Sequence, residues 1–206
     1  MGVRLGPPAV NLLNTGRRST EKEESVMDIR RLVTGHDSQG KAVFVSDEAV
    51  PPITVSLVPG MEFHRLWGSD SPAHFPDDGA SPEAVSYFPP LGGFRFGLFT
   101  IPPDQGRGVP EGLDVEAALA EFQERLPGLA EFLEPGEPGM HTTATIDYGI
   151  VVSGQATLEL DDGVKVALEA GDTYIQNGTR HRWSNTGAVP AVVAIALLGA
   201  SHDKIG

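Results

Sequence analysis

The final third of the chain is a series of short strand-like segments separated by glycine-containing turns, and this pattern limits the fold more than any other feature. The clearest turn is Asp162-Gly163, because Asp-Gly between alternating apolar residues is typical of a β-hairpin. Closely spaced short strands with tight turns predict an antiparallel sandwich or barrel. The strand-like segments cover residues 142–152, 155–160, 164–168, 173–176, 181–184 and 191–198.

The preceding part of the chain predicts further strands and one helix. A proline-rich stretch at 69–92 predicts a long surface excursion between strands. Apolar residues recur at helical spacing from Leu113 to Leu126 and predict one amphipathic helix on the outside of a sheet domain. The additional strand candidates are residues 29–34, 41–46, 53–57, 61–67 and 94–101.

These patterns divide the 206 residues into three parts. Residues 1–26 show no sustained periodicity and are expected to be an N-terminal extension. Residues 27–138 supply N-terminal strands, the proline-rich excursion and the helix, and residues 139–200 form the core barrel. The expected fold class is all-β and antiparallel, with extra N-terminal strands and one flanking amphipathic helix.

Composition excludes several classes of function. The chain has no cysteine, which removes disulfides and thiolate metal sites, so any metal must bind to nitrogen and oxygen. The net charge of −13 opposes contact with nucleic acid. No apolar run approaches the length of a membrane span, and no signal peptide is recognisable. We therefore expect a cytoplasmic protein that binds neither nucleic acid nor membrane.

Two segments carry motifs around histidines. His141 is followed by Asp147, and Gly154 comes seven residues after that carboxylate. The second segment has its own glycines, a histidine and an asparagine at Gly171, Gly178, His181 and Asn185. In residue type and spacing these segments resemble the two signature motifs of the cupin superfamily, and the resemblance covers residues 139–199. It implies a double-stranded β-helix, also described as a jelly-roll barrel.

The resemblance also implies a metal site, with departures. Metal-binding cupins usually offer three histidines and a glutamate, whereas here Thr143 replaces the second histidine and Asp147 the glutamate. The implied catalytic and metal-binding set is His141, Asp147 and His181. Two imidazoles and one carboxylate suit a divalent Fe, Mn, Ni or Zn ion. An alternative stays open, in which the three side chains form an internal hydrogen-bond network without an ion.

Trp183 shares strand parity with His181 and is therefore expected to face the same cavity. Tyr148 has the opposite parity to Asp147 and reaches the cavity only if the strand contains a bulge. His64 stands among apolar residues that are able to line a cavity. The residues expected around the substrate pocket are Thr143, Trp183, Tyr148, His64 and Phe96.

The resemblance implies a cupin-type, metal-dependent enzyme that acts on a small oxygenated organic molecule in the barrel pocket, as a dioxygenase, isomerase, cyclase or lyase. Without metal, the histidines would serve as general acid and base. The alternative is a metal-free cupin that binds a small ligand without turnover. A homodimer is expected by analogy and because sheet edges need cover.

Overall fold

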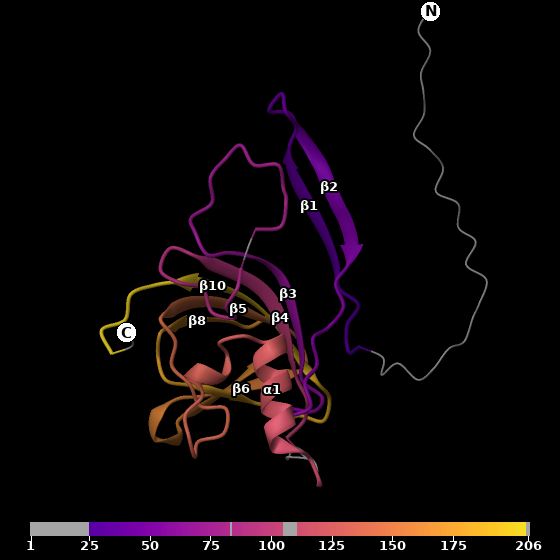
Figure 1. The fold of residues 1–206 in the computed structure, drawn as a ribbon. Helices are drawn as coiled ribbons and strands as arrows, with labels where there is room; N and C mark the ends of the chain where they lie inside the picture. Colours follow the sequence, from indigo (N-terminus) through magenta and orange to yellow (C-terminus); the bar gives the residue numbers. More distant parts are fainter. Residues whose placement is uncertain (1–24, 83, 105–110, 205–206) are drawn as a thin grey trace, which may run out of the picture.

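The computed structural model describes residues 25–82, 84–104 and 111–204 (Figure 1). Of the expected N-terminal extension, residues 1–24 lie outside the described residues. The described part folds into ten strands, one α-helix and two short 3-10 helices. The elements are β1 (Arg30–His36), β2 (Ala42–Ala49), β3 (Glu62–Ser69), β4 (Phe94–Ile101), α1 (Val115–Arg125), η1 (Ala130–Phe132), β5 (Thr145–Ser153), β6 (Gln155–Glu159), η2 (Asp161–Gly163), β7 (Lys165–Glu169), β8 (Thr173–Asn177), β9 (Arg182–Ser184) and β10 (Ala191–Gly199).

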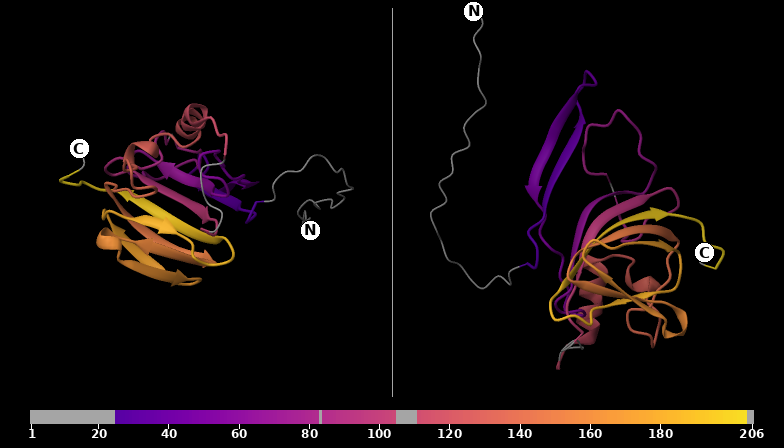
Figure 2. Two further views of the ribbon diagram at one scale, coloured as in Figure 1. Left: turned by 90° about the horizontal axis from the view of Figure 1, so that it is seen from below. Right: turned by 180° about the vertical axis from the view of Figure 1, so that it is seen from behind.

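All strand pairs in these sheets are antiparallel. Strands β1 and β2 pair only with each other, and their hairpin projects from the body (Figure 1). The body consists of a five-stranded sheet in the order β3-β4-β10-β5-β8 and a three-stranded sheet in the order β7-β6-β9. These two sheets lie one above the other, as Figure 2 shows. The expected all-β antiparallel fold with extra N-terminal strands is confirmed.

The core lies between the two sheets of the body. Ile101, Val151 and Val193 from the larger sheet are fully buried, and Ala156 from β6 meets them from the smaller sheet. On β5 the buried residues occupy every second position, so the same strand presents its other face to solvent. Burial of these apolar side chains holds the two sheets together.

Helix α1 flanks the core, as expected from its apolar spacing. The Asp114 side chain accepts a hydrogen bond from the Ala117 backbone N–H at 3.1 Å and so caps the first turn. Phe122 and Leu126 are almost completely buried in the core cluster. The opposite side of the helix is exposed, in agreement with the amphipathic pattern. No helix in the described stretches is long and apolar enough to cross a membrane.

Three expectations about local structure are wrong. Residues 53–57 do not form a strand, because only Ile53 makes a bridge, to Phe63 of β3. The strand expected from residue 142 begins at Thr145. The 69–92 excursion is not wholly a surface segment: Phe88 is buried in the core cluster and Tyr87 is packed against it. Burying two aromatic rings outweighs the polar and proline-rich character of their neighbours.

Candidate active site

His141 and His181 come from separate segments and lie side by side. Their backbones form one antiparallel bridge, in which each backbone N–H donates to the other residue's carbonyl at 2.9 Å. The centres of the two imidazole rings are 4.2 Å apart. The fold therefore brings into contact the two histidines that the resemblance to the cupin motifs implies as site residues.

The orientation of each imidazole follows from a local hydrogen bond. Nδ1 of His141 lies 3.0 Å from the Gly139 carbonyl oxygen, and Nδ1 of His181 lies 2.8 Å from the Thr179 carbonyl oxygen. A carbonyl oxygen only accepts, so each Nδ1 carries the proton and donates it. Neither Nε2 has a hydrogen-bond partner among the described residues. Each Nε2 is therefore an available acceptor.

Burial controls the charge of these rings. Desolvation is the main cause that lowers the pKa of His181 to about 4, and the neighbouring His141 contributes to the same shift. Desolvation is also the main cause that lowers the pKa of His141. Both rings are consequently neutral near neutral pH, so the single proton of each ring is at Nδ1 and Nε2 keeps its lone pair.

Asp147 lies on the inward face of β5 and is only 3% exposed. Within residues 25–82, 84–104 and 111–204, its Oδ1 atom has no hydrogen-bond partner. Desolvation raises the pKa of Asp147 to about 6, and the Thr145 hydroxyl partly opposes this shift. Thr143, which occupies the position of the missing histidine, has its hydroxyl 2.8 Å from that of Thr145. Thr143 is buried and does not line the cavity.

The main cavity has a volume of about 640 Å³. His141, Asp147, His181 and Trp183 line it, so the structure brings these four predicted residues to one cavity. Its volume lies within the range of roughly 300–1,000 Å³ that is typical of small-molecule sites. Most of the wall is apolar, with contributions from Leu57, Met61, Phe63, Tyr87, Phe88, Phe99, Phe122, Leu129, Leu133, Ile195 and Leu197.

Two residues expected at the pocket lie on the outer face of the large sheet. Tyr148 is 45% exposed and Phe96 is 46% exposed. The pairing of β5 with β8 runs through Tyr148 without a register shift, so no bulge turns this side chain inward. Phe96 points outward because Phe99, at the opposite parity of β4, occupies the core. These placements correct the expectation for both residues.

His64 is also absent from the main cavity. It is buried and contributes, with Phe96, to a second pocket of about 230 Å³. Its Nδ1 lies 3.1 Å from the Val50 carbonyl oxygen, whereas its Nε2 has no hydrogen-bond partner in the part of the chain that the structure describes. Three arginines line the same pocket, namely Arg31, Arg65 and Arg95.

Sequence reasoning missed part of the cavity wall. Tyr87 and Phe88 come from the proline-rich excursion, and Leu129 and Leu133 come from the segment after α1. The only signal for the first pair was an aromatic dipeptide inside a polar segment.

The close approach at Gly149 was not predicted either. A Cβ atom there would lie 2.2 Å from the ring of Tyr174, so this glycine makes room for that ring.

We tested whether the expected metal ligands fit an ion. The two imidazoles offer free Nε2 atoms, and carbonyl-anchored Nδ1 atoms are typical of histidine ligands. However, no three His, Asp or Glu side chains in the described ranges stand close enough together to hold a metal ion. Asp147 therefore does not complete a three-ligand set with the histidine pair.

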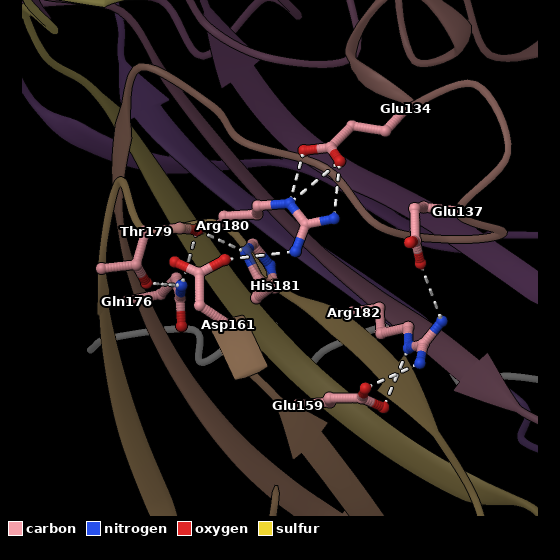
Figure 3. Close-up of polar contacts among 9 residues, drawn as sticks. All are labelled: Glu134, Glu137, Glu159, Asp161, Gln176, Thr179, Arg180, His181 and Arg182. Carbon is pink, nitrogen blue, oxygen red and sulfur yellow. Dashed lines mark hydrogen bonds and ion pairs between the residues drawn. The ribbon is translucent and has the colours of Figure 1, made fainter. Parts of the chain in front are cut away.

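Ion pairs flank His181 on both sides (Figure 3). Arg180 binds the Glu134 carboxylate through Nε and Nη2 at 2.7–2.9 Å and reaches Asp161 at 3.1 Å. Arg182 binds the Glu159 carboxylate at 2.6 and 2.8 Å. The Arg180 pair ties the segment before His141 to the segment that carries His181.

Asn185, from the second motif, has a structural role. It is fully buried, and its side-chain amide donates to the carbonyl oxygens of Ile101 and Val189, both at 2.9 Å. Its Oδ1 accepts from the Gly187 backbone N–H at 2.8 Å. The motif asparagine therefore fixes the turn after β9 against the end of β4.

The two facing antiparallel sheets and the histidine pair between them define the class of this protein, and comparison with known sequences agrees. Residues 130–197 match the family described as Cupin domain. The chain belongs to the cupin superfamily, because the cupin-domain-containing protein virC exceeds 30% identity with it over most of both chains.

Three relatives are fungal proteins. Cupin-domain-containing oxidoreductase virC of Hypocrea virens is 36% identical over 192 residues, which cover 91% of this chain and 84% of virC. Oryzines biosynthesis cluster protein J of Aspergillus oryzae is 26% identical over 163 residues, 79% of this chain and 78% of that protein. Cupin-domain-containing oxidoreductase fogC of Aspergillus ruber is 26% identical over 171 residues, 82% of this chain and 71% of fogC.

Proposed function

We propose that this cupin is an enzyme that binds a small oxygenated organic molecule in the main cavity and moves a proton on it. One observation carries the proposal: three acceptor atoms without partners, Nε2 of His141, Nε2 of His181 and Oδ1 of Asp147, belong to residues that line one largely apolar cavity. The names of virC and fogC, which contain the word oxidoreductase, support an enzymatic role.

Asp147 is the residue suited to accept the proton. Its buried Oδ1 lacks a donor, so an approaching substrate hydroxyl or acidic C–H supplies the missing proton. The O–H or C–H bond breaks, its electron pair stays on the substrate, and the carboxylate takes the proton. Return of that proton to another substrate atom gives a tautomer.

The two histidines are suited to hold the substrate during this step. Each ring uses its Nδ1–H on a backbone carbonyl and offers a lone pair at Nε2. A substrate hydroxyl that donates to these atoms is held in a fixed orientation, which lowers the entropic part of the barrier. Removal of a proton from a held hydroxyl is a step that isomerisation and oxidation of hydroxylated compounds share.

Hydrogen–deuterium exchange tests the proposal without knowledge of the natural substrate. 1,3-Dihydroxynaphthalene exchanges its ring hydrogens beside the hydroxyl groups through a keto tautomer, and proton NMR in D2O measures the rate. We expect the wild-type protein to accelerate this exchange and Asp147→Asn to reduce the acceleration by about 100-fold or more, the usual contribution of a general base. Asp162→Asn, at an exposed turn, is the matched control and should retain the wild-type rate.

Equal acceleration by wild type and Asp147→Asn would contradict the proposal. Binding of the probe without any acceleration would also contradict it, and would instead support the alternative expected from the sequence, a cupin that holds its ligand without turnover.

A further inference from the structure

We infer that the main cavity selects uncharged, largely aromatic molecules that carry at least one hydroxyl or N–H donor, and that it rejects carboxylates and phosphates. This inference rests on the proposed function for the choice of cavity, and it concerns the class of ligand rather than the reaction.

The requirement for a donor follows from the acceptors in the cavity. Nε2 of His141 and of His181 have no partners among the described residues, and Oδ1 of Asp147 is buried without one. A buried polar atom that stays unpaired destabilises the complex, whereas a ligand O–H or N–H satisfies it. A ligand of the same shape without donors leaves these atoms unpaired.

The rejection of anions follows from the charges around the cavity. Lys165 and Arg182 are the two cationic side chains among the described residues that line it, and both bind the Glu159 carboxylate, at 3.2 and 2.6 Å. A carboxylate or phosphate beside Asp147 would therefore place a second negative group in the cavity. Both cationic side chains that line it are already paired with Glu159. Burying an uncompensated charge in this way opposes binding.

Three arginines line a different pocket. Arg31, Arg65 and Arg95 line the second pocket and do not line the main cavity. The fold therefore places its arginine cluster outside the cavity that holds the histidine pair, which agrees with an uncharged ligand there.

Aromatic rings surround the histidine pair and favour a flat ligand. The ring of Phe88 lies 6.2 Å from that of His141, and the ring of Trp183 lies 6.5 Å from that of His181 at an interplanar angle of 88°. Phe99 contacts Trp183 edge-on at 6.0 Å. Ring faces and edges at these angles pack against an inserted aromatic ring in stacked or edge-to-face geometry.

Calorimetric titration of the full chain with three naphthalenes tests the inference. 1,3-Dihydroxynaphthalene carries two donors, 1,3-dimethoxynaphthalene has the same skeleton without a donor, and 1-naphthoate is an anion. We expect the diol to bind about tenfold or more tightly than the dimethoxy compound, because hydrogen bonds to charged or otherwise unpaired acceptors are lost. We expect no measurable binding of the naphthoate.

A variant checks that the preference comes from the cavity acceptors. Asp147→Asn should reduce the ratio of diol to dimethoxy affinity, and Asp162→Asn should leave it unchanged. The wild-type ligand series is informative even if Asp147→Asn fails to fold. Equal affinity for the diol and the dimethoxy compound, or tighter binding of the naphthoate, would overturn the inference.

The two proposals fail in different ways. Donor-dependent binding without faster hydrogen exchange leaves the ligand class standing and removes the proton-transfer function. Faster exchange with equal affinity for the diol and dimethoxy compounds leaves the proton-transfer function standing and removes the inferred ligand class.

Discussion

His141 and His181 are oriented by the same local device: each Nδ1 donates to the carbonyl oxygen two residues earlier, at 3.0 Å for His141 and 2.8 Å for His181. With the ring centres 4.2 Å apart, the two segments present an almost symmetric pair of acceptors. The backbone bridge between the residues holds this arrangement independently of any ligand.

Removing one acceptor of this pair should weaken binding of a donor ligand. We expect His181→Leu to reduce the affinity for 1,3-dihydroxynaphthalene about fivefold to tenfold, the value of one lost hydrogen bond. His181→Gln, whose side-chain oxygen accepts a hydrogen bond, should retain more of the affinity. Calorimetric titration measures both, and equal losses in the two variants would show that Nε2 makes no hydrogen bond to the ligand.

Gly149 should tolerate no side chain while Tyr174 is present. A Cβ at this position would overlap the Tyr174 ring at 2.2 Å, so we expect Gly149→Ala to lower the free energy of unfolding by about 1–3 kcal/mol. In a Tyr174→Leu background, Gly149→Ala should lower the free energy of unfolding by less, because the overlapping ring is gone. Urea unfolding of the two single variants and the double variant gives the coupling, and strict additivity would be inconsistent with the overlap.

Glu159 should make stability depend on acid pH. Its hydrogen bonds with Arg182, and then with Lys165, lower its pKa from 4.5 to about 2. A depressed folded-state pKa contributes stability that is complete above pH 4.5 and is lost as the pH falls towards about 2. We expect Glu159→Gln to show a shallower loss of unfolding free energy across this interval. Glu124→Gln, an equal charge change on the exposed face of α1, is the control and should follow the wild type.

The ion pair between Arg180 and Glu134 should restrain the segment that leads to His141. We expect Arg180→Leu to accelerate amide hydrogen exchange of Glu134 and Met140 about twofold to fivefold, since partly exposed ion pairs contribute less than about 1 kcal/mol. Arg30→Leu breaks the Arg30–Asp47 pair of the distant hairpin and serves as the matched control. Unchanged exchange in Arg180→Leu would show that the pair does not restrain the segment.

Removal of divalent cations should not affect ligand binding. The backbone bridge between His141 and His181 and the hydrogen bond from each Nδ1 to a backbone carbonyl position the two rings. We expect protein dialysed against a chelator to bind 1,3-dihydroxynaphthalene with unchanged affinity. Loss of affinity on dialysis, with recovery on adding back one divalent metal, would show that an ion organises the site.

Much of the fold and part of the site were predictable because they depend on local pattern. The convergence of His141 and His181 was implied by the resemblance of their segments to the cupin motifs, and the inward direction of Trp183 follows from strand parity. Phe96 was misplaced because both faces of β4 are apolar, so parity alone does not say which face is buried.

Other parts of the site were not predictable because they depend on tertiary packing. Tyr87 and Phe88 belong to a segment without periodicity, and only the assembled cavity brings them inward. The separation of Asp147 from the two histidines likewise depends on the path of the chain between His141 and the start of β5, which the motif spacing does not define.

Arg180, His181 and Arg182 are consecutive in the chain, so a histidine that lines the cavity lies between two arginines whose ion pairs hold neighbouring segments. This adjacency means that a change in either ion pair acts on the backbone that orients the His181 ring. A substitution that loosens the rim to admit a bulkier compound shifts the same backbone that aims the imidazole.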